Sequence, residues 1–513
     1  MSQSALKHIV FVTGFGMTHI RPSLHFCIRL AAKFSNVFIS VYIPGPLSPE
    51  AQKYLDTYPK TAYERVHIVP SIINIPITNP FDLLFSMERS FGPWIAEQLA
   101  SPKLEIDGQT VERPSYIIDD HINGGVALMN KQHHKLPIAS WWVATVASFI
   151  AHYGNAENGG GWRVIGAASA VLEQQDPGSK KSLEEIYSEE LVADRVVRIP
   201  GLPPHYEHEQ MTQFLPFFLP LMVMMYKRWA SIQEHDGIIV FTSFYELEPV
   251  AADAAANALL KPVTPFYVGV AADISPSNTL SIDADTSDPV LSFMNRAYAD
   301  LGAHSVIYVA FGSHFFPPAQ SVGHLKILIE EVIAQGLRLV LSVKPEQAKS
   351  VGLDSEYLEA IAGTGNAIFP AWTQQLQVLE HPALHYFVTH GGWNSTTEAM
   401  VRGVPMIFWP MAGDQPATAM QMARQHDCGF ELMQVRTGPA RCSAYNPDGD
   451  LAITGSTEAV REEVQNILKL SKEKKGEQQR LNIQALGKLA RESNETGGSA
   501  DIALEKLGKA LGL

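Results

Sequence analysis

The segment formed by residues 372–415 constrains the fold of this chain more than any other part of the sequence. An apolar run at residues 386–388 leads into a glycine turn at residues 389–392. Helical spacing follows, and a second apolar run covers residues 404–409. Strand, turn, helix and strand in this order are typical of a βαβ unit with parallel strands. The segment therefore predicts α/β structure.

The turn in this segment predicts a binding site for an anion. It presents His390 and backbone N–H groups at the start of a helix, where roughly half a positive charge attracts phosphates. The second apolar run is followed by Asp414 and Gln415, at the carboxyl edge where open α/β sheets bind ligands. Small polar residues that can cap the helix or donate to phosphate oxygens are Asn394, Ser395 and Thr396.

Residues 372–415 closely resemble, without a gap, the nucleotide-sugar signature of the UDP-dependent glycosyltransferases that modify small molecules. The resemblance implies that Trp372 stacks on uracil, Gln375 contacts the base and Glu398 accepts hydrogen bonds from ribose hydroxyls. It assigns the diphosphate to His390, Asn394 and Ser395, and the sugar hydroxyls to Asp414 and Gln415. The donor-site residues it implies are Ser313, Trp372, Gln375, His390, Trp393, Asn394, Ser395, Glu398, Asp414 and Gln415.

The signature departs from the plant form at two positions. Gln374 stands where proline is usual, and Gly391 stands where cysteine is usual. Neither departure removes a side chain that contacts the ligand in the family. The alternative, an ordinary βαβ unit with a buried histidine, does not account for Trp, Gln, His, Glu and Asp-Gln standing together in register.

Two regions with alternating strands and helices predict two α/β domains in these 513 residues. The predicted strands of the first domain are 8–13, 37–42, 66–69, 116–120, 138–143, 237–241 and 266–270. Those of the second are 305–311, 337–343, 367–369, 385–389 and 405–409, with 430–433 as a further candidate. The resemblance implies the GT-B architecture, two Rossmann-like doubly wound domains facing across a cleft. We expect an acceptor domain over 1–270, a linker over 271–287, and a UDP-sugar domain over 288–513 whose last helices cross back to the first domain.

Two stretches of the first half are open to more than one interpretation. Residues 155–190 form either a lid over the acceptor cleft or a surface excursion. Residues 214–226 are the most apolar run, but are too short to cross a bilayer and contain two prolines. We expect a buried helix or a wall of the acceptor pocket there, with peripheral membrane contact as the alternative.

A catalytic base is predicted in the turn after the first strand. Gly14 and Gly16 suggest a dinucleotide loop, but His19 stands where such a loop has its third glycine, and no acidic residue follows at the distance needed to hold a ribose. The turn instead resembles the His-x-x-Pro catalytic loop of the same family, with Pro22 expected to start the helix. The resemblance implies that His19 is the general base, a role that suits imidazole near neutral pH.

A histidine base needs an acidic partner to orient its ring. The strand over residues 116–118 ends in Asp119 and Asp120, at a carboxyl edge where such a partner belongs. By its distance from Leu136 and Pro137, Asp120 fits the family position best. Asp119 is the alternative, and we expect the other carboxylate of the two to be solvated or to cap a helix.

A third loop follows the first strand of the second domain, at residues 310–314. Its small residues allow a phosphate to approach, and the family uses a matching Gly-Ser loop for UDP, which makes Ser313 a donor-site candidate. His314 is expected at the surface. Asp283 and Asp285 match the Asp-x-Asp triplet of metal-dependent glycosyltransferases but fall in the expected linker, so we expect neither a metal site nor a cofactor besides the UDP-sugar co-substrate.

Composition narrows the class of protein further. The net charge of −14 argues against a general nucleic-acid or anionic-membrane binder. Three cysteines without CxxC spacing indicate reduced thiols in a cytoplasmic protein. The short apolar run near the N-terminus passes into a glycine turn, so we expect a first strand and not a signal peptide. We expect a monomer without an integral membrane segment.

The resemblance therefore implies an inverting, metal-independent enzyme that transfers a sugar from a UDP-sugar to a hydroxyl of a small lipophilic acceptor. We expect glucose, with xylose as an alternative, and a terpenoid, polyketide or phenolic acceptor of the kind found in fungal secondary metabolism. One alternative is a sterol or lipid glycosyltransferase. Another is a non-catalytic UDP-sugar-binding subunit, against which the presence of both His19 and Asp120 argues.

Overall fold

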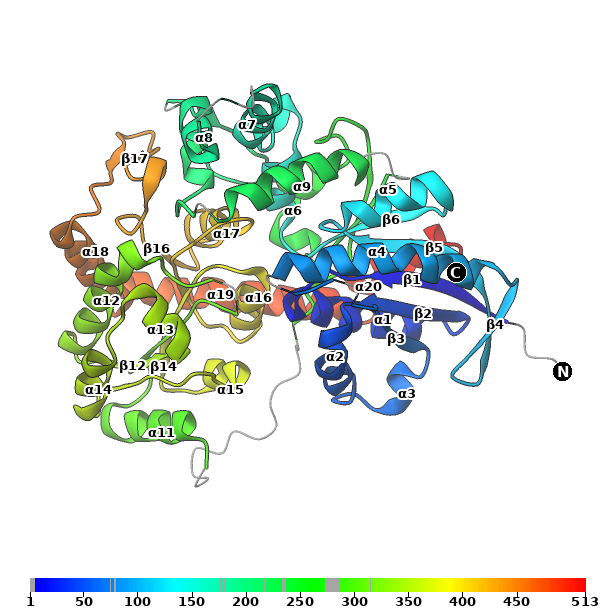
Figure 1. The fold of residues 1–513 in the computed structure, drawn as a ribbon. Coiled ribbons are helices and arrows are strands. Elements are labelled where there is room, and N and C mark those ends of the chain that lie inside the picture. The colour runs from blue at the N-terminus through cyan, green and yellow to red at the C-terminus, as the bar shows by residue number, and fades with distance from the viewer. Residues whose placement is uncertain are drawn as a thin grey trace. The chain divides into compact units, whose positions relative to one another are not determined.

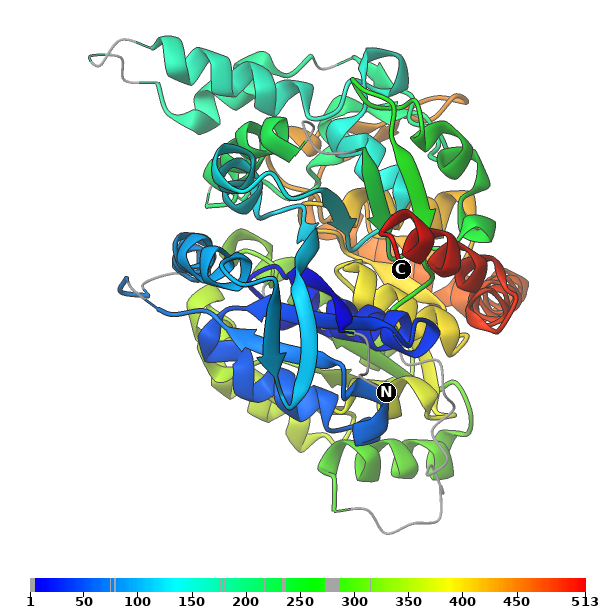
Figure 2. The same ribbon diagram turned by 90° about the vertical axis from the view of Figure 1, so that its right-hand side faces the viewer.

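The computed structural model describes residues 5–73, 75–77, 80–175, 178, 181–192, 194–215, 217–232, 237–272, 287–313 and 315–513. They form two compact units, drawn in Figures 1 and 2. Unit 1 comprises Met1–Glu173, Pro220–Ala271 and Glu492–Leu513, and unit 2 comprises Gln174–Leu219 and Ala272–Arg491. The expected first domain, 1–270, is thus wrong over residues 174–219, which belong to unit 2. Most of the expected linker, with Asp283 and Asp285, and also His314, lie outside the described residues.

Unit 1 is built on a sheet in the order β10-β9-β6-β5-β1-β2-β3, with β4 paired to β5. Every pair is parallel except β4 with β5. The strands β1 and β2 are apolar and largely buried on both faces, as expected when helices cover both sides of a parallel sheet. The strands are β1 (Leu6–Val12), β2 (Val37–Ile43), β3 (Val66–Pro70), β4 (Lys103–Ile106), β5 (Gln109–Asp120), β6 (Ile138–Trp142), β9 (Ile238–Phe241) and β10 (Thr264–Tyr267).

The α-helices associated with unit 1 connect these strands, except α20, which is the last element of the chain. They are α1 (Met17–Lys33), α2 (Ser48–Leu55), α3 (Lys60–Tyr63), α4 (Pro80–Leu99), α5 (Gly124–His133), α6 (Val146–Tyr153), α7 (Arg163–Gln174), α9 (Leu219–Ile232), α10 (Pro249–Ala255) and α20 (Ser499–Ala510). The apolar run at 214–226 enters α9, whose Leu219, Met222 and Val223 are buried. Among the described residues, no helix has the length and apolar character to cross a membrane.

Helix α1 begins earlier than the sequence predicts. We expected Pro22 to start the helix, but α1 starts at Met17 and contains Pro22 in its second turn. The carbonyl of Gly16 accepts hydrogen bonds from the amides of His19 and Ile20, so the first turn closes before the proline. His19 consequently lies on the first turn of a helix and not in a loop.

Unit 2 has a second parallel sheet, in the order β13-β12-β11-β14-β15-β16. Its strands are β11 (Val306–Ala310), β12 (Arg338–Leu341), β13 (Ala367–Ile368), β14 (Leu384–Thr389), β15 (Met406–Phe408) and β16 (Gly429–Glu431), and two short hairpins pair β7 (Val196–Val197) with β8 (His205–Tyr206) and β17 (Ser443–Ala444) with β18 (Leu451–Ala452). Its helices are α8 (Leu183–Glu190), α11 (Pro289–Leu301), α12 (Val322–Ala334), α13 (Pro345–Val351), α14 (Ser355–Gly363), α15 (Gln375–Glu380), α16 (Trp393–Val401), α17 (Gln415–Ala419), α18 (Thr457–Ser471) and α19 (Lys474–Asn494).

The chain returns to unit 1 at its end. Glu492–Leu513 belongs to unit 1, and within that unit Lys33 on α1 bonds Asp501 on α20 at 2.6 Å. The amide of Asn494 donates to the carbonyl of Val270 at 3.3 Å, beside the end of β10. The red C-terminal helix can be followed to this unit in Figure 2.

Candidate functional site

The structure brings His19 and Asp120 together in unit 1. Nδ1 of His19 lies 2.8 Å from Oδ2 of Asp120, although 101 residues separate them in the sequence. The reason is the sheet order: β1 and β5 are parallel neighbours, with Val12 in register with Asp119. The first turn of α1, which follows β1, therefore meets the last residue of β5.

Gly14 allows this pair to form. A Cβ atom at position 14 would lie 2.7 Å from Cγ of His19 and 2.7 Å from Cδ1 of Ile122, closer than real Cβ contacts come. The first glycine of the Gly-x-Gly turn thus makes room for the His19 ring. In this chain the glycine serves a side chain of the protein and not a dinucleotide.

Asp120 is a fully buried carboxylate between two histidines. Its Oδ1 accepts from the amide of Ile122 at 3.3 Å and lies 3.1 Å from Nδ1 of His121. Burial alone would raise the pKa of Asp120, but the charge of His19 and the two histidine contacts outweigh it and hold the pKa below its usual range. Asp120 is therefore a carboxylate at neutral pH. Sequence reasoning missed His121, although it is adjacent to the predicted pair.

Asp119 has a different environment from its neighbour. It accepts a hydrogen bond from the side chain of Asn123 at 3.2 Å, and burial raises its pKa well above the ordinary value. The expectation that the second carboxylate is solvated is wrong, because Asp119 is only 2% exposed. It is also not the N-cap residue of the following helix α5, which is Asn123. Side chains alternate along a strand, so Asp119 and Asp120 point to opposite faces of the sheet.

In unit 2, the predicted phosphate turn lies between β14 and α16. His390 is nearly buried, and glycines of two loops surround its ring. A Cβ atom at Gly392 would lie 2.4 Å from its Nε2, and one at Gly312 would lie 2.9 Å from its Cε1. The Gly312 loop, with Ser313 exposed beside it, is thus brought against His390. This places two of the predicted donor-site loops next to each other.

The start of α16 differs from the prediction in its capping. Gly392 is the N-cap residue and makes no side-chain cap, so the expectation that Asn394, Ser395 or Thr396 caps the helix is wrong. Asn394 and Ser395 lie within the first turn and are partly exposed, as donors to a phosphate would be. Trp393 is 4% exposed and packs in the interior.

The remaining donor-site residues of the signature lie in the loop after β13, on the helices α15 and α16, and in the turn after β15. Trp372 is 72% exposed, an unusual position for a large aromatic ring and one that leaves its face open for stacking. Gln375 donates to Glu398 at 2.6 Å and to Ser395 at 3.3 Å. Oε1 of Gln415 accepts from the amides of Met411 and Ala412 and closes the turn after β15, while Asp414 is the N-cap residue of α17.

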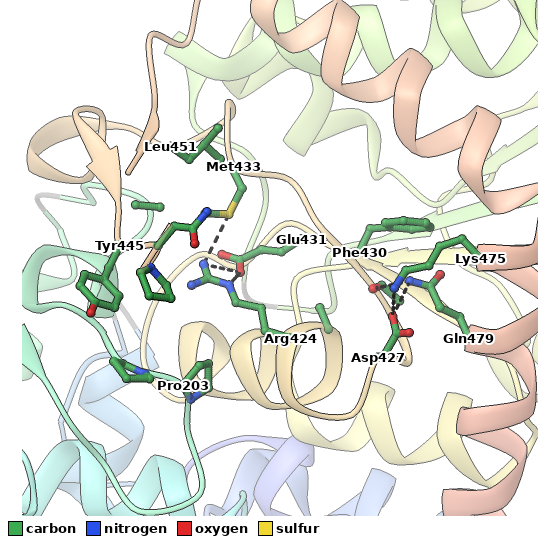
Figure 3. A pocket seen from close by; sticks show the side chains of 16 residues that line it. Pro203, Arg424, Asp427, Phe430, Glu431, Met433, Tyr445, Leu451, Lys475 and Gln479 are labelled. Carbon is green, nitrogen blue, oxygen red and sulfur yellow. Dashed lines mark hydrogen bonds and ion pairs between the residues drawn. The ribbon is translucent and has the colours of Figure 1, made fainter. Parts of the chain in front are cut away.

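A separate cavity of about 580 Å³ opens elsewhere in unit 2, beside the edge strand β16 (Figure 3). Its charged side chains are paired with one another: Lys475 lies 2.7 Å from Asp427, and Arg424 lies 2.8 Å from Glu431. None of the predicted donor-site residues lines it. Among the described residues, no group of three or more His, Cys, Asp or Glu side chains is arranged to hold a metal ion.

Known proteins resemble this chain in sequence and in fold. Residues 280–436, which include every predicted donor-site residue, match the family described as "UDP-glucoronosyl and UDP-glucosyl transferase". The chain is 24% identical to "UDP-glycosyltransferase eriJ" of Hericium erinaceus over 95% of its own length and 94% of that protein's. It is 29% identical to "Limonoid UDP-glucosyltransferase" of Citrus unshiu over 46% and 45% of the two lengths.

Solved structures share the fold over the whole chain. A UGT transferase from Siraitia grosvenorii in complex with UDP has a TM-score of 0.69 at 18% identity, covering 99% of this chain and 100% of that one. UGT71G1 from Medicago truncatula, complexed with UDP-glucose, has a TM-score of 0.66 at 19% identity, covering 99% and 98%. These likenesses confirm the predicted GT-B class, with two Rossmann-like parallel-sheet units.

Proposed function

Because this chain belongs to the UDP-glycosyltransferase family, we propose that it transfers glucose from UDP-glucose to a hydroxyl group of a small lipophilic acceptor, with inversion at the anomeric carbon and without a metal or other cofactor. The observation that carries the proposal is the contact of 2.8 Å between His19 and the buried Asp120. A non-catalytic binding subunit has no need of this pair. The name of the limonoid relative supports an acceptor from secondary metabolism, and a terpenoid is our first choice.

In the proposed reaction His19 is the general base. The ionised Asp120 accepts a hydrogen bond from Nδ1–H of His19, so Nε2 is the basic nitrogen of the ring and takes the proton of the acceptor hydroxyl. Asp120 also stabilises the imidazolium that results. The His19 side chain is 21% exposed, so it can reach a substrate while its partner is shielded from water.

The oxygen of the acceptor then attacks the anomeric carbon from the face opposite the diphosphate. The new carbon–oxygen bond forms as the bond to the β-phosphate oxygen breaks, so UDP leaves with the electron pair and the configuration inverts. Negative charge grows on the diphosphate, where preorganised donors stabilise it: His390, Asn394, Ser395 and the N-terminus of α16. Trp372 and Glu398 hold the uridine.

The test is to incubate the purified protein with a panel of UDP-sugars and a mixed terpenoid and phenol library in EDTA, and to read the products by mass. We expect a hexose increment with UDP-glucose that is unchanged by the chelator. A pentose increment would replace glucose by xylose, and loss of transfer in EDTA would overturn metal independence. Binding of UDP without transfer from any donor would favour the non-catalytic alternative.

A further inference from the structure

Tyr308, a residue outside the signature, contacts residues next to the predicted nucleotide site through its hydroxyl group. Tyr308 lies on β11, is 1% exposed, and its hydroxyl contacts two side chains of the Trp372 loop. It lies 2.7 Å from Oγ1 of Thr373 and 3.2 Å from Oε1 of Gln375. All of these residues belong to unit 2.

The donor and the acceptor can be assigned in both hydrogen bonds of the Tyr308 hydroxyl. A tyrosine hydroxyl carries a single proton. Tyr308 donates it to Oε1 of Gln375, so the hydroxyl of Thr373 must donate to Tyr308. With its oxygen held in this way, the amide of Gln375 turns its nitrogen toward Oε2 of Glu398, at 2.6 Å. The reversed amide would put an oxygen against the carboxylate, which is repulsive.

The position of Tyr308 is rigid. Its ring stacks on Phe387 of β14 with centroids 4.9 Å apart and planes 12° from parallel, and the two residues are direct register partners. Burial raises the pKa of Tyr308 far above the ordinary value, so its hydroxyl keeps its proton throughout the physiological range. The chain of hydrogen bonds therefore starts from a fixed point in the sheet.

We propose that Tyr308 is a positioning residue of the nucleotide site, which acts through Gln375 to fix the carboxylate of Glu398 for recognition of the ribose hydroxyls. The inference rests on the proposed function, because that function assigns the ribose to Glu398. Glu398 is 4% exposed, so few orientations are open to it besides the one that Gln375 selects. Thr373 is the first donor in this series of hydrogen bonds, and its contribution to the positioning of Glu398 is smaller than that of Tyr308.

Gln374, the residue next to Thr373, is also held by a hydrogen bond to a side chain. Nε2 of Gln374 donates to Asp288 at 3.1 Å, and Asp288 caps α11 through the amides of Val290 and Leu291. Gln374 stands where plant relatives usually have proline, a residue that restricts the backbone by itself. In this chain, side-chain hydrogen bonds at two consecutive positions, 373 and 374, hold the loop that carries Trp372 and leads into Gln375, the first residue of α15.

The experiment compares the binding of UDP and of 2′-deoxy-UDP by calorimetry in the wild type and in Tyr308→Phe. The wild type should prefer UDP, because Glu398 accepts from the ribose hydroxyls. In Tyr308→Phe we expect the Kd of UDP to rise roughly fivefold to tenfold, as for loss of one well-placed hydrogen bond. The Kd of 2′-deoxy-UDP should rise less, because this ligand lacks one of the hydroxyls that Glu398 binds, so the preference shrinks. A purely structural role would weaken both ligands equally, and that result would overturn the inference.

Tyr386→Phe is the matched control. Tyr386 is also fully buried, lies on the adjacent strand β14, and donates to Gln479 at 2.8 Å. Its removal costs a comparable hydrogen bond but should leave the ratio of the two dissociation constants unchanged. A change in that ratio as large as in Tyr308→Phe would show that any buried hydroxyl has this effect, and would overturn the inference.

Two further variants follow the chain of hydrogen bonds. Thr373→Val should shift the preference in the same direction but less, and it replaces Tyr308→Phe if that variant does not fold. In a Gln375→Ala background, Tyr308→Phe should have no further effect, because the two act through one path. Additive effects would overturn the inference. A wild type that binds both nucleotides equally would overturn it together with the ribose assignment, and a protein that does not bind UDP would overturn the proposed function.

Discussion

The candidate base of unit 1 and the donor segment of unit 2 are built on different physical principles. In unit 1 a single contact joins His19 to a fully buried charge, and its two members are far apart in the sequence. In unit 2 the predicted residues fall mostly in one continuous segment, with neutral donors, glycines and a helix terminus around the phosphate turn. Catalysis should therefore be lost when either member of the His19–Asp120 pair is removed, whereas UDP binding should weaken gradually as single donor-site groups are removed.

The largest effect is expected from His19→Ala. Removal of the base should lower kcat/KM about 10³-fold, within the range of general-base catalysis. The Kd of UDP should not change, because the donor-site residues all belong to unit 2. Steady-state kinetics together with UDP calorimetry measure both quantities. The matched control is His25→Ala. It removes another histidine of α1, whose ring contacts the hydroxyl of Tyr58. Loss of UDP binding in His19→Ala would mean that the base is misassigned.

Asp120→Asn is expected to lower kcat/KM by roughly 10² to 10⁴-fold, because an amide no longer selects the Nδ1–H tautomer of His19 or stabilises the imidazolium. The measurement is kcat/KM against pH. Asp119→Asn is the control, since Asp119 makes its hydrogen bond to Asn123. Equal losses in the two variants would remove the distinction between the neighbouring carboxylates.

Trp372→Ala tests the donor segment. Loss of stacking should weaken UDP binding by about 10 to 100-fold, since stacking of a base on an aromatic ring contributes ~1–3 kcal/mol. The Tm should hardly change, because the side chain is 72% exposed. Phe217→Ala removes another exposed ring of unit 2 and should leave UDP binding intact. A large fall in the Tm of Trp372→Ala would indicate a structural role.

The smallest effect is expected for the stability of Asp119→Asn. Because burial raises the pKa of Asp119, the unfolded chain loses this proton at a lower pH than the folded protein. The wild type should therefore lose stability as pH rises from the unfolded pKa, about 4, towards the folded pKa. The variant lacks this loss, and its Tm relative to wild type should improve by roughly 2 to 4 °C between pH 5 and pH 8. If the Tm of the wild type and that of Asp119→Asn changed in parallel with pH, the raised pKa of Asp119 would be contradicted.

Much of the fold and of the donor site could be predicted from the sequence because the signals are local. The apolar runs predicted the strands β1, β2, β11 and β14 to within a few residues. All donor-site residues except Ser313 fall in one segment, residues 372–415, so the resemblance of that segment could place them together although they lie on several loops and helices. The prediction of a capping residue failed at α16. Gly392 and the three polar residues after Trp393 all suit the start of a helix, and only the backbone geometry distinguishes them.

By itself the sequence determined two α/β units, a nucleotide-sugar signature and a histidine with two candidate partners, since periodicity and motif spacing are properties of neighbouring residues. The tertiary structure decided between Asp119 and Asp120, and it assigned residues 174–219 to unit 2. It also connected Tyr308 to Gln375. These outcomes depend on strand order and burial, which bring together groups that are far apart in the chain and which set the free energy of each charge. No local pattern contains that information.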